Sequence, residues 1–147
     1  MWKDCNLVQD MIKKIVVVSG YFNPLHSGHI KYFQEAKKLG DKLLVIVNND
    51  KQCQLKGNIF MNEQERMEII KSLKMVNDVI LSIDVDESVC KTLEFLKPHI
   101  FANGGDRFSK DIPEYKLCKK MGIKMVFGVG GRKTQSSSNL LHNRREK

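Results

Sequence analysis

Short runs of β-branched and aliphatic residues, each followed by a segment with helical spacing, most limit how this chain can fold. Residues 15–19 read Ile-Val-Val-Val-Ser and residues 43–47 read Leu-Leu-Val-Ile-Val. Unbroken apolar runs of this length are typical of strands buried on both faces of a parallel sheet. Between them, residues 29–39 carry an apolar side chain at every third or fourth position, and Gly40 is expected to end that helix.

The same alternation continues along the chain and predicts five strands connected by helices. Residues 51–60 show no periodicity and are expected to form a loop. Parallel strands need crossover connections, and right-handed helical crossovers cover both faces of a sheet. We therefore expect a Rossmann-like, doubly wound α/β sheet of about five parallel strands. The expected strands are 15–19, 43–47, 79–82, 100–102 and 124–127, and the expected helices are 29–39, 62–73, 88–97, 115–121 and one beginning near Ser136.

The length of 147 residues suits one domain. We expect an N-terminal extension at 1–13, the domain at 14–141 and a basic tail at 142–147. No apolar run approaches the roughly 20 residues that cross a bilayer, and the first ten residues lack the apolar centre of a signal peptide. A cytoplasmic protein with four reduced cysteines is therefore expected, since no two cysteines form a C-x-x-C pair.

The chain is basic, with 25 Lys and Arg against 17 Asp and Glu and a net charge of +8. Positive charge attracts phosphate, whether on nucleotides, nucleic acids or lipid headgroups. The aromatic residues are sparse and mostly stand beside aliphatic residues, and no nucleic-acid binding module is evident. We therefore expect a smaller anionic ligand rather than nucleic acid.

The loop after the first strand reads GYFNPLHSGH at residues 20–29. Ligands of doubly wound sheets bind beyond the carboxyl ends of the strands. Gly20 permits a tight turn, and Gly28 lets a phosphate approach the start of the following helix, where N–H groups and the dipole favour anions. The rings of His26 and His29 can donate hydrogen bonds to a phosphoryl group whose charge grows in the transition state.

Two other interpretations of the histidine pair exist. A metal pair would need further ligands, and no cysteine or third histidine lies close in sequence. One histidine could serve only as a helix cap, although the N-terminus of a helix disfavours a charged imidazole. The order strand, glycine, His-x-Gly-His, helix favours a role in handling phosphate.

Residues 22–29 resemble the HxGH motif of the cytidylyltransferase-like nucleotidylyltransferases, which include heptose-1-phosphate adenylyltransferase and glycerol-3-phosphate cytidylyltransferase. The resemblance extends over about residues 14–141. It implies transfer of a nucleoside monophosphate from ATP or CTP, accompanied by Mg²⁺, to a phosphorylated sugar, polyol or alcohol. Pyrophosphate is released by direct in-line attack, without a protein nucleophile, and relatives often form homodimers.

The resemblance assigns stabilisation of the α-phosphate to His26 and His29. Many members of the family carry Asp where this chain has Asn23, which leaves open what a carboxylate would contribute there. The residues of this loop expected to bind the nucleotide are Gly20, Tyr21, Phe22, Asn23 and Gly28.

The segment after the second strand resembles the heptose-1-phosphate branch, with Asn-x-Asp followed by Leu-Lys-Gly. The resemblance implies that Lys56 neutralises phosphate, although it could be an ordinary solvated lysine. Arg66 matches the arginine of the family's helical Glu-x-Arg-type motif, and the resemblance implies that it clamps a phosphate. Alternatively, Arg66 is a surface arginine of the helix that pairs with a nearby glutamate. Acceptor-binding residues are expected at Asn49, Asp50 and Arg132.

Two further segments carry glycines or hydroxyls. Gly104 and Gly105 can expose main-chain groups to a base or ribose, and Asp106 can accept from a ribose hydroxyl or help to hold the metal, although a plain glycine turn would read the same. Residues 130–141 resemble the family's Ser-Thr-Thr motif, whose hydroxyls cap a helix and bind the β- and γ-phosphates, or only cap it. This second segment contributes Gln135, Ser136, Ser137 and Ser138 to the expected nucleotide site, and Gly128 of the glycine-rich loop 128–131 is expected there as well.

Gly-Gly-Asp at residues 104–106, like Leu-Lys-Gly at 55–57, resembles the heptose-1-phosphate adenylyltransferase branch. This resemblance tilts the expected donor toward ATP and leaves CTP open. A non-catalytic nucleotide or nucleic-acid binding module is supported only by the charge. A dinucleotide oxidoreductase would carry G-x-G-x-x-G in the first turn, which this chain lacks.

Overall fold

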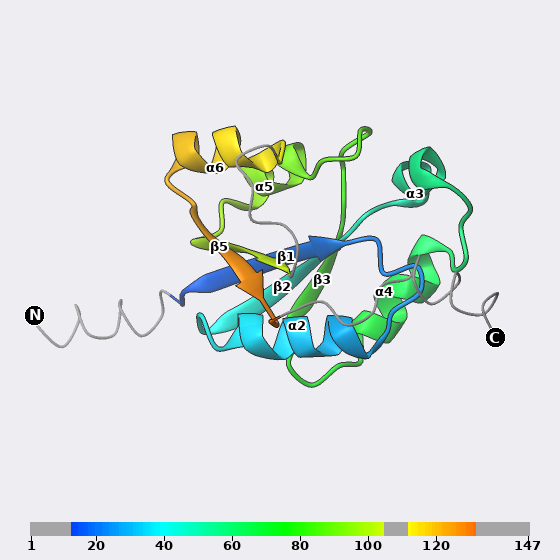
Figure 1. Cartoon of the computed structure of the whole chain (residues 1–147), viewed down its shortest axis with the longest axis horizontal. Helices are drawn as coiled ribbons and strands as arrows, with labels where there is room; N and C mark the ends of the chain where they lie inside the picture. Colours follow the sequence, from blue (N-terminus) through cyan, green and yellow to red (C-terminus); the bar gives the residue numbers. More distant parts are fainter. Residues whose placement is uncertain (1–12, 105–111, 132–147) are drawn as a thin grey trace, which may run out of the picture.

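Five parallel strands form one sheet in the order β3-β2-β1-β4-β5 in the computed structural model, which describes residues 13–104 and 112–131 (Figure 1). This architecture confirms the predicted doubly wound α/β fold. The strands are β1 (Ile15–Gly20), β2 (Lys42–Val47), β3 (Asp78–Leu81), β4 (Ile100–Gly104) and β5 (Lys124–Val129). The helices are α2 (Ser27–Lys37), α3 (Asp50–Lys56), α4 (Glu63–Lys71), α5 (Cys90–Leu96) and α6 (Glu114–Met121).

The central strand β1 contributes to both halves of the core because successive side chains of a strand point to opposite faces. Val16 and Val18 lie in the cluster that α2 and α4 cover, whereas Val17 lies in the cluster that α5 and α6 cover. All three side chains are fully buried. Figure 1 shows the two helix layers on either side of the sheet. The unbroken apolar run of β1 therefore reflects burial on both faces.

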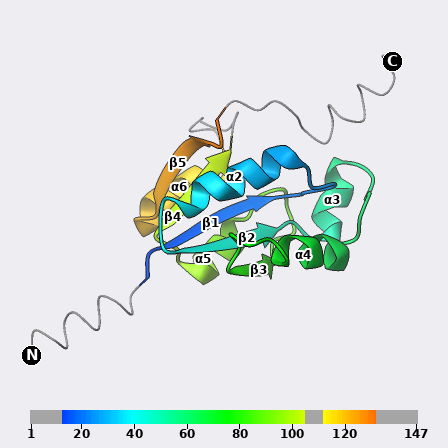
Figure 2. The ribbon, with the colours of Figure 1, turned by 90° about the horizontal axis from the view of Figure 1, so that it is seen from below.

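The order of the strands places the topological switch point beside β1. β1 pairs with β2 from Ile15↔Lys42 to Gly20↔Val47, and the chain continues outward to β3. It then crosses to the other side, where β4 pairs with β1 and β5 completes the sheet (Figure 2). Ligands of such sheets bind at the carboxyl edge of this point. The loop after β1 therefore borders the expected crevice.

Residues 50–56 form the short helix α3, where the sequence predicts a loop. The helix has no regular apolar stripe, because its buried positions are only Gln52 and Cys53. Its start is instead capped reciprocally: the Asn49 side chain accepts from the Gln52 N–H at 2.9 Å, and the Gln52 side chain accepts from the Asn49 N–H at 3.0 Å. Asn followed three residues later by Gln is a capping signal that the sequence carries.

Smaller differences concern the ends of elements. α2 begins at Ser27 rather than at residue 29, so that Gly28 lies in its first turn. β5 extends through Gly128, which was expected in a loop; its φ of 68° lies beside an irregularity in the pairing of β4 with β5. The expected N-terminal extension, C-terminal tail and helix near Ser136 lie outside the described residues. Within the described part of the chain, no helix is long and apolar enough to cross a bilayer.

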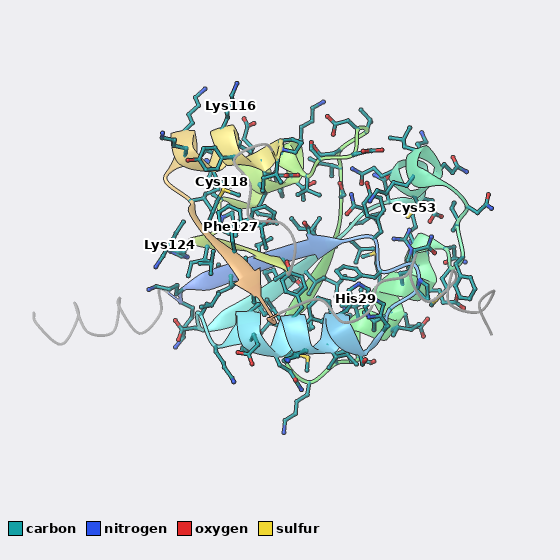
Figure 3. The ribbon with its side chains drawn as sticks, viewed as in Figure 1. His29, Cys53, Lys116, Cys118, Lys124 and Phe127 are labelled. Atoms are coloured by element: carbon teal, nitrogen blue, oxygen red, sulfur yellow. The ribbon has the colours of Figure 1, made fainter. Side chains whose placement is uncertain are left out.

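The thiol of Cys118 gives a direct test of the packing between α6 and the sheet (Figure 3). Burial raises the pKa of this thiol from an ordinary 9.0 to about 12. At pH 8 its thiolate fraction is therefore about a thousandfold lower than that of an ordinary thiol, and alkylation needs the thiolate. We expect iodoacetamide to modify Cys118 only after unfolding in guanidinium, as read by peptide mass spectrometry. Modification of the folded protein at the rate of a free peptide thiol would contradict this packing.

Candidate active site

Two histidines cap the start of α2, because the ring of each accepts a hydrogen bond from a main-chain N–H group at the N-terminus of the helix. Nδ1 of His26 accepts a hydrogen bond from the N–H of Gly28 at 3.1 Å, and Nδ1 of His29 accepts one from the N–H of His26, also at 3.1 Å. The pattern is a capping box with histidine in both positions. The capping role considered for one histidine is thus filled by both, and the Gly28 amide is used within the protein.

These caps determine which nitrogen of each ring carries the proton. An Nδ1 atom that accepts a hydrogen bond carries no proton, so the neutral rings of His26 and His29 are both protonated on Nε2. The rings are stacked, with centroids 3.8 Å apart and 26° between their planes. Figure 3 shows His29 at the amino end of α2. The pair therefore places two ring N–H groups near the end of the helix whose dipole favours anions. Of the two, the Nε2 atom of His26 is itself buried in the structure.

The ring of Phe22 packs against the ring of His29. Phe22 is buried and contacts the His29 ring edge to face, with centroids 4.9 Å apart and 87° between the planes. Its backbone has a left-handed φ of 51°, which folds the ring back over the end of β1. A Cβ at Gly20 would lie 2.7 Å from this ring, so only glycine leaves room for it. Gly20 thus leaves room for the Phe22 ring, and the Phe22 ring packs against His29.

Asn23 joins the loop after β1 to the connection between α3 and α4, residues 57–62. Its side-chain oxygen accepts from the N–H of Phe60 at 2.8 Å and of Met61 at 3.0 Å, and its amide donates to the carbonyl of Asn58 at 3.0 Å. An aspartate could accept the first two hydrogen bonds but could not donate the third. This geometry gives a physical reason for asparagine at a position where many family members carry Asp.

Arg66 lies inside the protein rather than on the surface of α4, with its side chain 0% exposed. Its guanidinium donates to the carbonyls of Met61, Tyr21 and Asn48 at 2.9, 2.8 and 2.6 Å, and it forms an ion pair with Asp50 at 2.8 Å. The alternative of a surface arginine is therefore wrong. Four of the five guanidinium donors are already used by protein groups.

The residues expected to bind the acceptor after β2 have structural partners. The Asn49 amide donates to the carbonyls of Ser82 and Asp84 at 3.0 and 2.9 Å, in addition to its cap of α3. Asp50 is paired with Arg66. Both side chains hold loops in place, and sequence inspection gave no sign of these partners because they lie 16 to 35 residues away.

Lys56 differs from these residues because its side chain is exposed at the end of α3. Its ammonium group lies over the ring of Tyr21, 4.5 Å from the ring centroid, in a cation–π contact. The contact brings a positive charge from α3 beside the loop that follows β1. Lys56 and Tyr21, two of the residues predicted for the site, are thus in contact in the structure.

The ends of β4 and β5 pack against α2 on the other side of the loop. The Tyr32 hydroxyl donates to the carbonyl of Ala102, and the ring of Tyr32 lies beside Gly104. A Cβ at Gly130 would lie 2.9 Å from the Cα of Tyr32, so glycine allows β5 to cross α2 closely. Sequence inspection did not single out Tyr32. The predicted residues Gly105, Asp106, Arg132, Gln135, Ser136, Ser137 and Ser138 lie outside the described residues.

The donor groups in the described ranges can be compared with what a metal ion requires. No group of three or more His, Cys, Asp or Glu side chains within residues 13–104 and 112–131 could hold a metal. Both Nδ1 atoms of the histidine pair are occupied by main-chain N–H groups. Mg²⁺ in nucleotide enzymes is commonly held by phosphate oxygens and one or two carboxylates.

Known proteins resemble this chain over most of its length. Residues 17–135 match the cytidylyltransferase-like family. The chain is 37% identical to FAD synthase of Ferroglobus placidus, over 76% of this chain and 72% of that protein. It is 35% identical to bifunctional protein HldE of Pelobacter propionicus, over 83% of this chain but only 26% of HldE. A solved lipopolysaccharide core biosynthesis protein of Thermoplasma volcanium is 33% identical, with a TM-score of 0.68, over 86% of this chain and all of that one.

The parallel sheet, the histidine pair at its switch point and these matches define a nucleotidyltransferase. The chain belongs to the cytidylyltransferase-like family. Membership confirms the class of enzyme that the His-x-Gly-His sequence predicts.

The tautomers of the histidine pair can be measured directly. Because both Nδ1 atoms accept main-chain hydrogen bonds, we expect long-range ¹H–¹⁵N spectra at pH 8 to show the Nε2-protonated form for His26 and His29. Assignment uses the single His→Ala variants, and His99 serves as an internal reference because its Nδ1 also accepts a main-chain N–H. Protonation of either ring on Nδ1 would contradict the capping box.

Proposed function

We propose that this protein transfers AMP from ATP to a phosphorylated small molecule and releases pyrophosphate. The observation that carries the proposal is the histidine pair, whose rings are stacked at the start of α2 with their protons on Nε2. ATP is favoured as donor because FAD, which the FAD synthases are named for, contains an adenylyl group. The Gly-Gly-Asp and Leu-Lys-Gly sequences also support this donor through the resemblance already described.

The proposed reaction is one in-line displacement at the α-phosphorus. An oxygen of the acceptor phosphate forms a bond to this phosphorus, and the bond to the bridging oxygen of pyrophosphate breaks. Charge grows on the α-phosphoryl oxygens as this happens. His26 and His29 donate Nε2–H hydrogen bonds to those oxygens, and donors fixed before the reaction stabilise the transition state more than the ground state. No protein nucleophile is required, since positioning and charge suffice for phosphoryl-type transfer.

Neutralisation of the remaining phosphate charge needs cations. Nucleotidyltransferases of this kind generally use a divalent metal, and Mg²⁺ bound to the triphosphate would supply this charge. Lys56 is the protein cation that we propose for the phosphates, because its ammonium lies beside the loop that carries the histidines. Cytidylyl transfer from CTP to glycerol 3-phosphate remains the alternative reaction of the same site.

The donor and the acceptor can be separated by a matrix assay. We expect the purified chain with Mg²⁺ to release pyrophosphate from ATP faster than from CTP in the presence of one acceptor among FMN, sugar 1-phosphates and glycerol 3-phosphate. The product is identified by mass spectrometry, and omission of the acceptor is the control. Faster release from CTP would overturn the proposed donor, and no release with any pair would overturn the proposed activity.

Replacement of His29 tests the electrostatic role. We expect His29→Ala to lower kcat by about 10²–10³, the usual effect of losing one preorganised donor. The matched control is His99→Ala, which also removes an Nδ1 acceptor for a main-chain N–H, at 3.0 Å, but at the amino edge of the sheet. That variant should keep its kcat. A folded His29→Ala protein with wild-type turnover would exclude the mechanism.

A further inference from the structure

We propose that Arg66 and Asn23 are positioning residues that hold Phe22, and through it His29, in the geometry the reaction needs. The kinetic consequence rests on the proposed function, whereas the positioning itself does not. This assigns Arg66 a role different from a phosphate clamp.

Phe22 has a backbone conformation that needs external support. Its φ of 51° lies in the left-handed region, which bulky residues adopt rarely. Such a conformation persists only where the surroundings over-determine it.

The two neighbours of Phe22 are each held by the same part of the chain. On one side, the carbonyl of Tyr21 accepts from the Arg66 guanidinium at 2.8 Å. On the other side, the Asn23 side chain makes three hydrogen bonds to the main chain of the α3–α4 connection. Phe22 is therefore fixed between two attachments to α4 and the segment that precedes it.

Arg66 is itself anchored so that it can act as a fixed point. It also binds the carbonyls of Asn48 and Met61 and the carboxylate of Asp50. These contacts connect the ends of β1 and β2 with the start of α4. Because the side chain is 0% exposed, the guanidinium offers no surface to a substrate. Its effect on the reaction must pass through the loop that it holds.

The effect reaches the histidine pair through aromatic contacts. The Phe22 ring meets His29 edge to face at 4.9 Å and Phe33 of α2 at 5.3 Å. The His29 ring in turn stacks on His26 at 3.8 Å. If Phe22 leaves its left-handed conformation, the ring beneath His29 moves and the Nε2–H groups lose their alignment. A displacement of about 1 Å in such a site can cost about 10²-fold in rate.

A kinetic double-mutant cycle tests this coupling. We expect Arg66→Gln to lower kcat about 10- to 100-fold with little change in the KM for ATP. In a His29→Ala background the same substitution should cost no more than about twofold, because the alignment it protects is already lost. Arg66→Lys keeps the charge but not the planar fork, so it should recover part of the rate. Equal losses in both backgrounds would assign Arg66 a direct role and overturn the inference.

A spectroscopic measurement decides the positioning even if no substrate pair reacts. We expect Arg66→Gln and Asn23→Ala each to shift the His26 amide and the His29 ring ¹⁵N signals. Asn23→Ala removes the second attachment and serves where Arg66→Gln does not fold. The matched control, Asn77→Ala, removes a side-chain acceptor for the Leu43 N–H at the amino end of β2 and should leave these signals unchanged. Histidine signals that stay at their wild-type positions in a folded Arg66→Gln or Asn23→Ala protein would overturn the inference.

Discussion

The hydrogen bonds that His26 and His29 exchange with the main chain at the start of α2 are the constraint on which the site depends. They begin the helix, fix the orientation of both rings and place each ring proton on Nε2. A serine and a glutamate would cap the helix as well, but they would bring a carboxylate to the position where this chain brings an imidazole. One local interaction thus stabilises the helix and prepares the donors for the proposed chemistry.

Most polar side chains around this pair hold loops together instead of facing a ligand. Asn23 bonds main-chain groups of the connection between α3 and α4, and Asn49 and Arg66 bond main-chain carbonyls of the loops after β1, β2 and β3. The hydrogen bonds of these side chains therefore make the loops rigid. A phosphoryl-transfer site needs rigid loops because it works mainly by positioning its substrates. Lys56, by contrast, has an exposed side chain and lies over the ring of Tyr21.

The relatives place the chain in a class without fixing its substrate. FAD synthase and bifunctional protein HldE carry different names, yet their identities to this chain are 37% and 35%. The family match covers residues 17–135, which include the sheet and the loop with both histidines. Similarity over most of the chain therefore supports the class of reaction more strongly than the acceptor.

The sequence by itself determined the parallel sheet, because apolar runs such as Val16–Val18 need burial on both faces and helical segments separate them. It also determined the histidine pair at the start of α2, since a capped helix after the first strand is a local pattern. The cap of α3 is also a local signal, although the helix lacks an apolar stripe that would predict its length. Only the tertiary structure decided that Arg66 is buried against Tyr21 and Asn48. This outcome depends on partners 45 and 18 residues away, and hydrogen bonds across such distances leave no periodicity in the sequence.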